Sequence, residues 1–443
     1  MINQQLSTAR ILGFSLGSVG TGLFGTTPTV LLLFYLTQLQ GVEAGLAGLA
    51  LLIPKLWDMI TNPIVGRWSD AFESKYGRRL PFMLLGALVM PIGLILMFSV
   101  PSSASPTLAF WWVLITYLFS TTAYTLFAVP YITIPSELSS DPNVRLKIMS
   151  YRTSGVMLGI ILGSGLPPLL IAHFGQTLGA YQQTAVILAL ICVVFMLCSI
   201  LSIRSLKLLQ PTINVAKIGF FKQIKGVMTP LFSYLIITHI LQIIAVGILL
   251  ASATYLAVFA NGFSPASAGT FLSATFITAM VAMPLWQKLS LLTSRVTAFA
   301  IGAIGYMIIS VTMYCFGLHI PYGHFIVFGI GFGLGFAAIQ MIPYALLSDT
   351  IHHHGERHGF GSEGVFTGLW TATEQSGLAI APFLVGVALQ QGGFLAGSDT
   401  QSDTATHAIL VTATLLPAGL ILLSLCSLYA FQRRYQASLG SAK

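Results

Sequence analysis

Charge is scarce in this sequence. Asp, Glu, Lys and Arg together make up 7% of the 443 residues, whereas hydrophobic residues make up 55% and the mean hydropathy is +0.86. A soluble domain of this size does not keep such a balance in water, so a soluble enzyme or binding module is excluded. The composition predicts a polytopic membrane protein.

Cysteine, strand-like alternation and catalytic clusters are scarce as well. The four cysteines all lie inside apolar runs, so we expect no disulfide framework. Segments of about ten residues with alternating hydrophobicity are absent, which excludes an outer-membrane barrel and leaves an all-α fold. The histidines within 352–358 have no cysteine or carboxylate cluster beside them, and no nucleophile–base pair is evident. We therefore expect no metal and no cofactor, and a membrane-embedded enzyme is a remote alternative.

Apolar runs of membrane-spanning length recur along the whole chain. Pro, Gly or charged residues separate them, and counting gives about twelve helices of roughly 20 residues or more. The first run follows Arg10 without a small-residue cleavage site, which indicates a first span and not a removed signal peptide. We place the spans at about 10–37, 43–66, 81–101, 108–134, 150–173, 181–204, 227–260, 264–290, 295–317, 321–350, 363–390 and 405–432.

The basic residues gather on one side of these spans. Every Lys and Arg except Lys55 lies before the first span, after the last, or next to a connection that follows an even-numbered span. Such a bias marks the cytoplasmic side, so we expect both termini to be cytoplasmic. The net charge of +8 is therefore a topology signal, and we expect no nucleic-acid partner.

The sequence divides into two halves of six spans. A long basic connection at 205–226 is expected to be a cytoplasmic linker between an N-terminal bundle, 1–204, and a C-terminal bundle, 227–443. The segment Pro130–Glu137 recurs as Pro343–Asp349, because each begins with Pro-Tyr and ends with Ser and an acid, and the two begin 213 residues apart. This offset is close to half the chain, as expected of parallel six-helix repeats.

Three charged residues lie well inside predicted spans and away from their ends, where a charge costs at least about 2.5–3.5 kcal/mol and usually faces a partner, a cavity or a transport path. Lys55 and Asp58 are three residues apart in the second span, so they share a helix face on which they can pair. Asp58 lies roughly 12 Å from the cytoplasmic end of its span, and Glu374 in the eleventh span lies roughly 16 Å from its own. Two carboxylates at similar depth indicate ion coupling or gating. The alternatives are a buried ion pair that only clamps helices and an inert, hydrogen-bonded Glu374.

Oxygen atoms can be assembled around Asp58. Asn62 lies one turn later on the same face, and Pro63 frees a backbone carbonyl in the preceding turn. With a hydroxyl such as that of Thr125 in the fourth span, these oxygens could surround a hard cation such as sodium. A proton on Asp58 is the alternative, and the sequence does not choose between them.

Polar and aromatic residues form a stripe on the fourth span, at steps of three and four residues. Facing a central cavity, this stripe could stack on a sugar ring and hydrogen-bond to hydroxyls. Helix packing explains any single member equally well, but as a set these residues favour an uncharged, polar or amphipathic ligand. The candidate substrate-binding residues are Tyr117, Thr121, Tyr124 and Ala128 in the fourth span, His239 and Gln242 in the seventh, Gln340 and Tyr344 in the tenth, and Trp370 and Gln375 in the eleventh.

The segment Trp57–Phe82, WDMITNPIVGRWSDAFESKYGRRLPF, resembles the second-span and loop signature of the glycoside–pentoside–hexuronide cation symporters, the melibiose-permease branch of the major facilitator superfamily. The similarity continues in Pro130–Arg152 and, more weakly, in Gly361–Gly377. It implies a twelve-helix fold of two six-helix repeats and cation-coupled transport. It does not name the substrate.

The resemblance also implies roles for single residues. Lys55 and Asp58 stand where the family has a basic residue and its first cation-coordinating aspartate. Thr125 stands where melibiose-type permeases supply a hydroxyl to that site, and Arg152 where they keep an arginine beside the sugar path. Three positions depart from the pattern: Asn62 replaces a second coupling aspartate, Ala128 replaces a sugar-binding aspartate, and Glu374 or Gln375 falls where a lysine is usual.

The loop Arg67–Arg79 resembles the gating motif of the superfamily, in which an aspartate and basic residues bridge helices on the cytoplasmic side. Asp70, Arg78 and Arg79 are expected to hold one closed state and to release in the other. Ordinary positive-inside charge is the alternative explanation of this loop.

These observations predict a monomeric secondary transporter of the inner membrane whose partners are a small molecule and the lipid bilayer. We expect symport of a glycoside or sugar-like solute, driven by H⁺ or Na⁺ and working by alternating access. The alternative keeps the fold and changes the solute to an amphipathic, lipid-like or hydrophobic compound.

Overall fold

The computed structural model describes residues 7–72, 74, 77–139, 141–206, 226–358 and 363–440. All regular elements in these ranges are helices, which confirms the predicted all-α class. A bilayer interior offers the backbone no water, so a spanning segment must pair its own N–H and C=O groups, as a helix does. In chain order the elements are α1 (Thr8–Phe34), η1 (Tyr35–Leu39), α2 (Ala44–Ala71), α3 (Leu80–Met97), α4 (Pro106–Leu138), α5 (Pro142–His173), α6 (Leu178–Ile203), α8 (Pro230–Tyr255), η2 (Leu256–Ala260), α9 (Ala266–Leu292), α10 (Arg295–Phe316), α11 (Tyr322–His358), α12 (Glu363–Gln391), α13 (Asp403–Ala413) and α14 (Leu415–Gly440).

Twelve helical segments in the described part of the chain are long and apolar enough to cross a membrane, which confirms the predicted number. The fourth and fifth helices run further than expected, because α4 continues to Leu138 and α5 begins at Pro142. Hydropathy marks the apolar length of a helix and does not report turns that continue beyond it. Of the predicted linker at 205–226, residues 207–225 lie outside the described residues.

Hydroxyl side chains fix the starts of many of these helices. Each one accepts a hydrogen bond from the backbone N–H three residues later, which satisfies a group that the helix itself leaves unpaired. Such caps are local and readable from sequence. The capping residues are Ser7, Ser105, Thr177, Thr229, Ser294 and Ser402.

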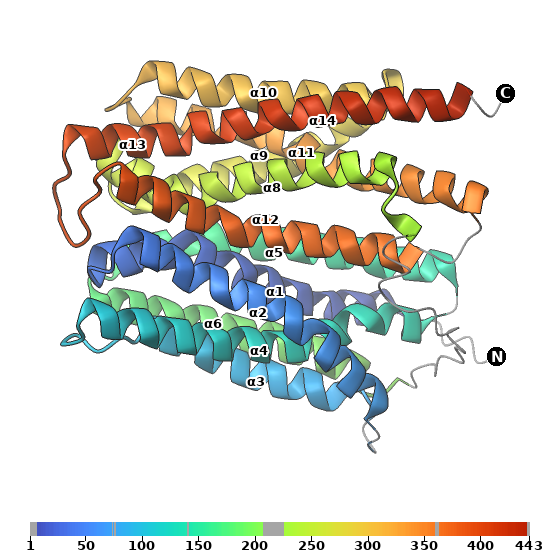
Figure 1. The fold of residues 1–443 in the computed structure, drawn as a ribbon. Coiled ribbons are helices and arrows are strands. Elements are labelled where there is room, and N and C mark those ends of the chain that lie inside the picture. The colour runs from blue at the N-terminus through green and yellow to red at the C-terminus, as the bar shows by residue number, and fades with distance from the viewer. Residues whose placement is uncertain are drawn as a thin grey trace. The chain divides into compact units, whose positions relative to one another are not determined.

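The chain forms two compact units, one with α1 to α6 and one with α8 to α14, in which α9 counts from Thr270. The helices of each unit run side by side (Figure 1). In the first unit, α1 packs on α5 and α6, and α3 packs on α4 and α6. In the second, α8 packs on α12 and α14, and α10 packs on α11 and α14. The first helix of each unit also ends alike, in a π-helical turn followed by a glycine with positive φ, at Gly41 (65°) and Gly262 (69°).

Small residues bring α5 close to α1. Gly155, Gly159 and Gly163 recur every four residues on one face of α5, and a methyl group on each would meet the backbone of α1. At Gly155 that added carbon would lie 2.7 Å from the carbonyl oxygen of Ser15. Close backbone approach of this kind is a main source of helix association in lipid, where no hydrophobic force drives the helices together.

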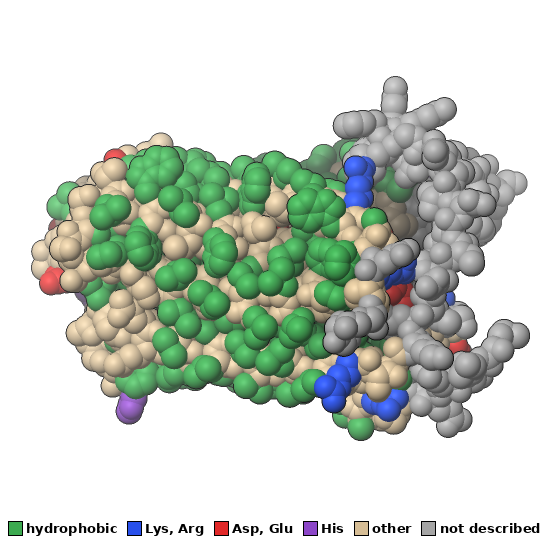
Figure 2. Space-filling model, turned by 90° about the horizontal axis from the view of Figure 1, so that it is seen from below, with side chains coloured by type: hydrophobic (Ala, Val, Ile, Leu, Met, Phe, Trp, Pro, Cys, Tyr) green, Lys and Arg blue, Asp and Glu red, His purple; other side chains and the backbone are tan. Residues whose placement is uncertain are grey.

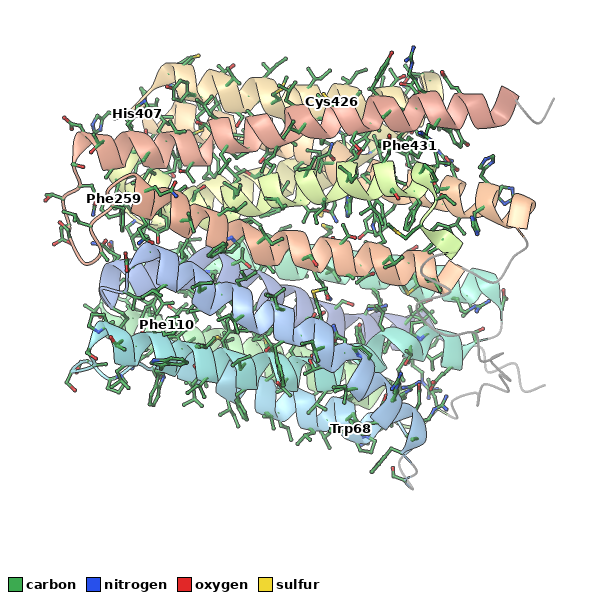
Figure 3. All side chains as sticks on the ribbon, viewed as in Figure 1. Trp68, Phe110, Phe259, His407, Cys426 and Phe431 are labelled. Atoms are coloured by element: carbon green, nitrogen blue, oxygen red, sulfur yellow. The ribbon has the colours of Figure 1, made fainter. Side chains whose placement is uncertain are left out.

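The surface shows where the apolar part of the protein lies. On the face in Figure 2, hydrophobic side chains cover a broad band and the Lys and Arg side chains gather at one end of it. Trp68, which is 62% exposed, lies near the end of α2 (Figure 3). Tryptophan at helix ends is typical of the interface between lipid and water.

Candidate functional site

Asp58 lies in a small polar cluster between α2 and α4. Its carboxylate is 5% exposed, and Oδ1 accepts a hydrogen bond of 2.5 Å from the hydroxyl of Thr125. The side chain of Asn62, one turn further along α2, also hydrogen-bonds to this carboxylate. The structure thus brings together the three residues expected to form the coupling site.

A further hydroxyl, which was not predicted as a site residue, joins this cluster. Thr61 Oγ1 lies 3.4 Å from Thr125 Oγ1 and donates to the backbone carbonyl of Asp58 at 3.2 Å. The group therefore holds a carboxylate, two hydroxyls and an amide, which are the oxygen ligands that hard cations prefer. It can equally hold a proton on the carboxylate.

Lys55 does not pair directly with Asp58, which corrects the expected ion pair. Lys55 and Asp58 attract each other electrostatically, but no ion pair between their charged atoms occurs among the described residues. Lys55 instead donates a hydrogen bond to the hydroxyl of Tyr117 on α4. The spacing of three residues places both side chains on one face, but the direction of each side chain then decides its partner.

The stripe on α4 packs partly against α1. Tyr124 stacks on Phe24 of α1, with ring centroids 5.2 Å apart. Thr121 donates to the backbone carbonyl of Tyr117, within its own helix, at 3.0 Å. Helix packing thus accounts for part of this stripe.

Arg152 of α5 is a buried cation without a carboxylate partner in the described part of the chain. Its guanidinium lies over the ring of Tyr131, 4.6 Å from the centroid, and Tyr131 is itself fixed by a 2.9 Å bond to the carbonyl of Phe14. The Nε atom of Arg152 is buried and has no hydrogen-bond partner among the described residues. An acceptor from a bound solute would satisfy it.

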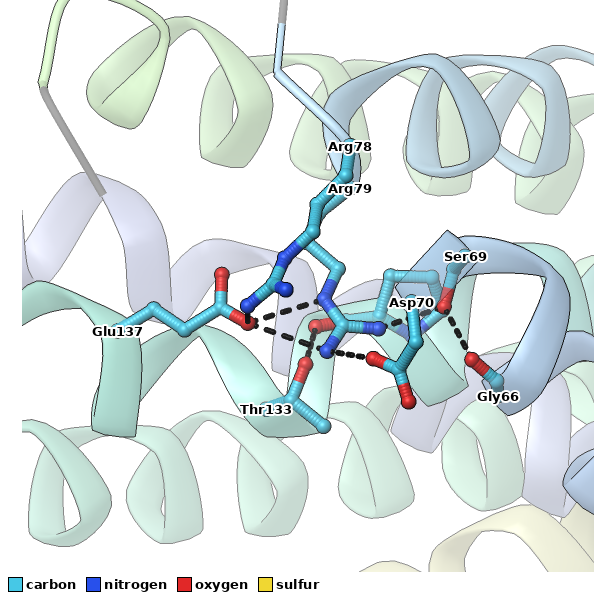
Figure 4. Close-up of polar contacts among 8 residues, drawn as sticks. Gly66, Ser69, Asp70, Arg78, Arg79, Thr133 and Glu137 are labelled. Atoms are coloured by element: carbon cyan, nitrogen blue, oxygen red, sulfur yellow. Dashed lines mark hydrogen bonds and ion pairs between the residues drawn. The ribbon is translucent and has the colours of Figure 1, made fainter. Parts of the chain in front are cut away.

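The loop between α2 and α3 carries a charged network (Figure 4). Arg79 forms an ion pair with Asp70, bonds Ser69 Oγ at 2.6 Å and lies 3.1 Å from Glu137 Oε1 at the end of α4. Arg78 reaches the same oxygen of Glu137 at 2.7 Å. Asp70, Arg78 and Arg79 therefore meet as expected, through a carboxylate that was not predicted as a site residue.

Glu137 had a signal in the sequence. It ends the segment Pro130–Glu137, whose repeat ends at Asp349, so an acid stands at the same place in both halves. In the second unit Asp349 of α11 pairs with Arg295, the first residue of α10. Two acids repeated on the basic side of the protein predict two arginine partners.

The second unit holds its own polar cluster, on α8, α11 and α12. Tyr344 donates a hydrogen bond of 2.6 Å to Glu374 Oε2, and Gln340 also hydrogen-bonds to this carboxylate. The ring of Trp370 meets that of Tyr344 edge to face at 5.8 Å and stacks on His239 at 3.9 Å. The structure thus gathers five residues that the sequence placed in three separate spans.

Three further predicted residues show no such convergence. Gln242 is fully buried and donates to Ser424 on α14 at 3.0 Å, which is a helix–helix contact. Ala128 and Gln375 are partly exposed, on α4 and α12. Their roles in substrate binding stay predictions.

Comparison with known proteins places the chain in a family. A family model described as MFS/sugar transport protein matches residues 13–432. The chain belongs to this family. The match confirms the resemblance to the melibiose-permease branch of the superfamily, and it makes the protein a multi-pass secondary transporter and not an enzyme.

Two relatives of this transporter have informative names. It is 24% identical to the sodium-dependent lysophosphatidylcholine symporter 1 of Mus musculus, over 95% of this chain and 85% of that one. It is also 24% identical to the glucuronide carrier protein homolog of Escherichia coli (strain K12), over 96% and 92% of the two chains. A solved bacterial homolog of the human lysosomal transporter Spinster has the same fold, with a TM-score of 0.73 at 13% identity over 98% and 99% of the two chains.

Proposed function

We propose that this transporter is a cation-coupled symporter that takes up a small glycoside or sugar-like solute, with Asp58 as the coupling carboxylate. The protein is expected to act as a monomer in the inner membrane, by alternating access. The coupling ion is H⁺ or Na⁺.

One observation carries the assignment of the coupling site. Asp58 is 5% exposed within a membrane-spanning helix, yet its nearest partners are uncharged oxygen and amide groups. A carboxylate in this position is costly unless a cation or a proton neutralises it. Binding and release of that ion would change the net charge of the cluster around Asp58, which is what coupling to an ion gradient requires.

The solute class is supported by the second group of residues in the first unit. Arg152 offers a buried nitrogen without an acceptor in the described part of the chain, and Tyr124 offers a partly exposed aromatic ring on the neighbouring helix α4. Rings that stack on a sugar and donors that bond its hydroxyl or carboxylate groups suit a glycoside or glucuronide. The glucuronide carrier among the relatives supports the same class.

The test is gradient-driven uptake by the purified transporter in proteoliposomes. Radiolabelled neutral glycosides and a glucuronide are offered under an imposed Na⁺ gradient, an imposed proton gradient, or neither. We expect one solute to accumulate under one of the gradients, and we expect Asp58→Asn to abolish accumulation while it spares exchange of labelled for unlabelled solute. Accumulation by Asp58→Asn at the wild-type level would refute the assignment.

A second solute class rests on a different observation. The lysophosphatidylcholine symporter is a relative over nearly the whole chain, and Ala128 stands where a sugar-binding aspartate is usual. An amphipathic or lipid-like solute fits both facts. A direct binding screen of glycosides against lysolipids separates the two classes, because an amphipathic solute would bind and the glycosides would not.

A further inference from the structure

Glu374 has no basic residue of its own to neutralise it. Its helix, α12, packs on α8, α11 and α13. Neither α8, α12 nor α13 contains a Lys or Arg. The only one in α11 is Arg357, thirteen residues beyond Tyr344 and therefore roughly 20 Å further along the helix.

The titratable groups near Glu374 supply hydrogen bonds and no positive charge. Tyr344 donates to the carboxylate from α11 at 2.6 Å, and Gln340 bonds it from the same helix. His239 of α8 stacks on Trp370 and is itself 1% exposed. Neither of its ring nitrogens has a hydrogen-bond partner in the described part of the chain. On α13 the titratable groups are Asp403 and His407, and Asp403 begins that helix. The helices that pack against α12 therefore supply no Lys or Arg beside Glu374, which leaves its carboxylate open to a cation from a bound ligand.

The groups around Glu374 favour an organic cation over a metal ion. A hard metal ion collects about six or more oxygen ligands, whereas Glu374 has a phenol and an amide beside it. No group of three or more His, Cys, Asp or Glu side chains suited to a metal occurs among the described residues. Aromatic rings are present instead, since Tyr344 is 43% exposed and meets Trp370 at 5.8 Å. An aromatic ring beside a carboxylate is a common receptor for a positively charged nitrogen.

We propose that Glu374, Tyr344 and Trp370 form a binding site for a positively charged nitrogen on the transported solute, either an amine or a quaternary ammonium group. The carboxylate supplies the opposite charge, and the ring of Tyr344 supplies a face for the cation. Trp370, held by its stack on His239, fixes the ring of Tyr344. This site deepens the proposed function, on which it rests, and it departs from the uncharged ligand that the sequence favoured.

The test compares probes that differ only in charge. Purified full-length transporter is titrated calorimetrically with choline and with its neutral isostere 3,3-dimethylbutan-1-ol, and with glucosamine and glucose. We expect at least one cationic probe to bind about tenfold more tightly than its neutral counterpart. Equal affinities within both pairs would overturn the proposal.

Variants of Glu374 and Tyr344 then test whether these residues cause the preference for the cationic probe. Glu374→Gln keeps the size of the side chain and removes its charge, so it should abolish the preference, whereas Glu374→Asp should retain part of it. Tyr344→Phe should weaken it several-fold. Tyr322→Phe is the matched control, since Tyr322 lies on the same helix and its hydroxyl shares a hydrogen bond with Thr270. A preference that survives in a folded Glu374→Gln protein would overturn the proposal.

Two outcomes distinguish this proposal from a proton site at Glu374 and from the proposed coupling at Asp58. If glucose binding takes up a proton and Glu374→Gln removes that uptake without any charge preference, Glu374 is a proton site and the proposal is wrong. Binding needs no gradient, so the charge preference is still measured if Asp58→Asn accumulates solute and the proposed coupling fails.

Discussion

The two units place an acid–arginine contact at the same point of the repeat but give it different surroundings. In the first unit, Arg79 and Glu137 are 6% and 5% exposed at their side chains, and Arg78, Asp70 and Ser69 join them. In the second, Arg295 and Asp349 are 46% and 32% exposed. A buried network is costly to break because a lone charge remains out of water, whereas water can replace a partner in the exposed pair. The two contacts therefore occupy the same place in the repeat but are expected to contribute unequally to stability.

The two intramembrane carboxylates, Asp58 and Glu374, also differ in the side chains around them. Asp58 has Lys55 within electrostatic reach and hydroxyls around it. Glu374 has aromatic neighbours, and the only Lys or Arg on the helices that pack against its own is Arg357, roughly 20 Å from Tyr344 along α11. We infer that Asp58 of the first unit couples the ion and that Glu374 of the second unit binds a charged group of the solute.

The largest expected effect on stability is that of Glu137→Gln. Of its two carboxylate partners Arg79 would keep only the exposed Asp70, and its buried guanidinium would lose its buried counter-charge. We expect a loss of about 3 kcal/mol or more. Thermal unfolding of the detergent-solubilised protein, followed by size-exclusion chromatography, measures it. A loss no larger than that of Asp349→Asn would erase the contrast between the units.

An intermediate effect is expected where the two units pack their equivalent helices. At Gly159 on α5, an added methyl group would meet the backbone of α1, whereas at Gly377 on α12 it would meet the side chain of Ile243 on α8, 2.8 Å away. Side chains can shift and a packed backbone cannot. Gly159→Ala should therefore cost about 1–3 kcal/mol and Gly377→Ala less. The same unfolding assay ranks them, and the reverse order would contradict this account of the packing.

The smallest effect is expected for Asp349→Asn. Arg295 would still donate to the carbonyl of Ala345 at 3.2 Å and remain in contact with water. The cost should be about 1 kcal/mol or less. A loss comparable to that of Glu137→Gln would show that the second pair also acts as a clamp.

The sequence was informative where the signal is local. The number of spans follows from apolar length, and Ser or Thr caps mark several helix starts, because both depend on neighbouring residues. The coupling group of Asp58, Asn62 and Thr125 was proposed from helix spacing and oxygen chemistry, and the resemblance to a known family implies Asp58 and Thr125 for the same site.

Contacts between distant segments were harder to predict. Arg79 and Glu137 are separated by all of α3 and nearly all of α4, and neither hydropathy nor spacing pairs them. The stack of His239 on Trp370 joins α8 to α12 in the same way. Even the local prediction that Lys55 pairs with Asp58 was wrong, because a shared helix face does not fix the direction of a long side chain.

The division of roles between the units is tested most directly by comparing solute exchange with gradient-driven uptake in two variants, Asp58→Asn and Glu374→Gln. Both are measured in proteoliposomes with the solute that the wild-type protein accumulates. The account predicts that Asp58→Asn keeps exchange and loses accumulation, whereas Glu374→Gln needs about tenfold more solute for half-maximal exchange. Loss of accumulation with unchanged exchange in Glu374→Gln, or wild-type accumulation in Asp58→Asn, would contradict it.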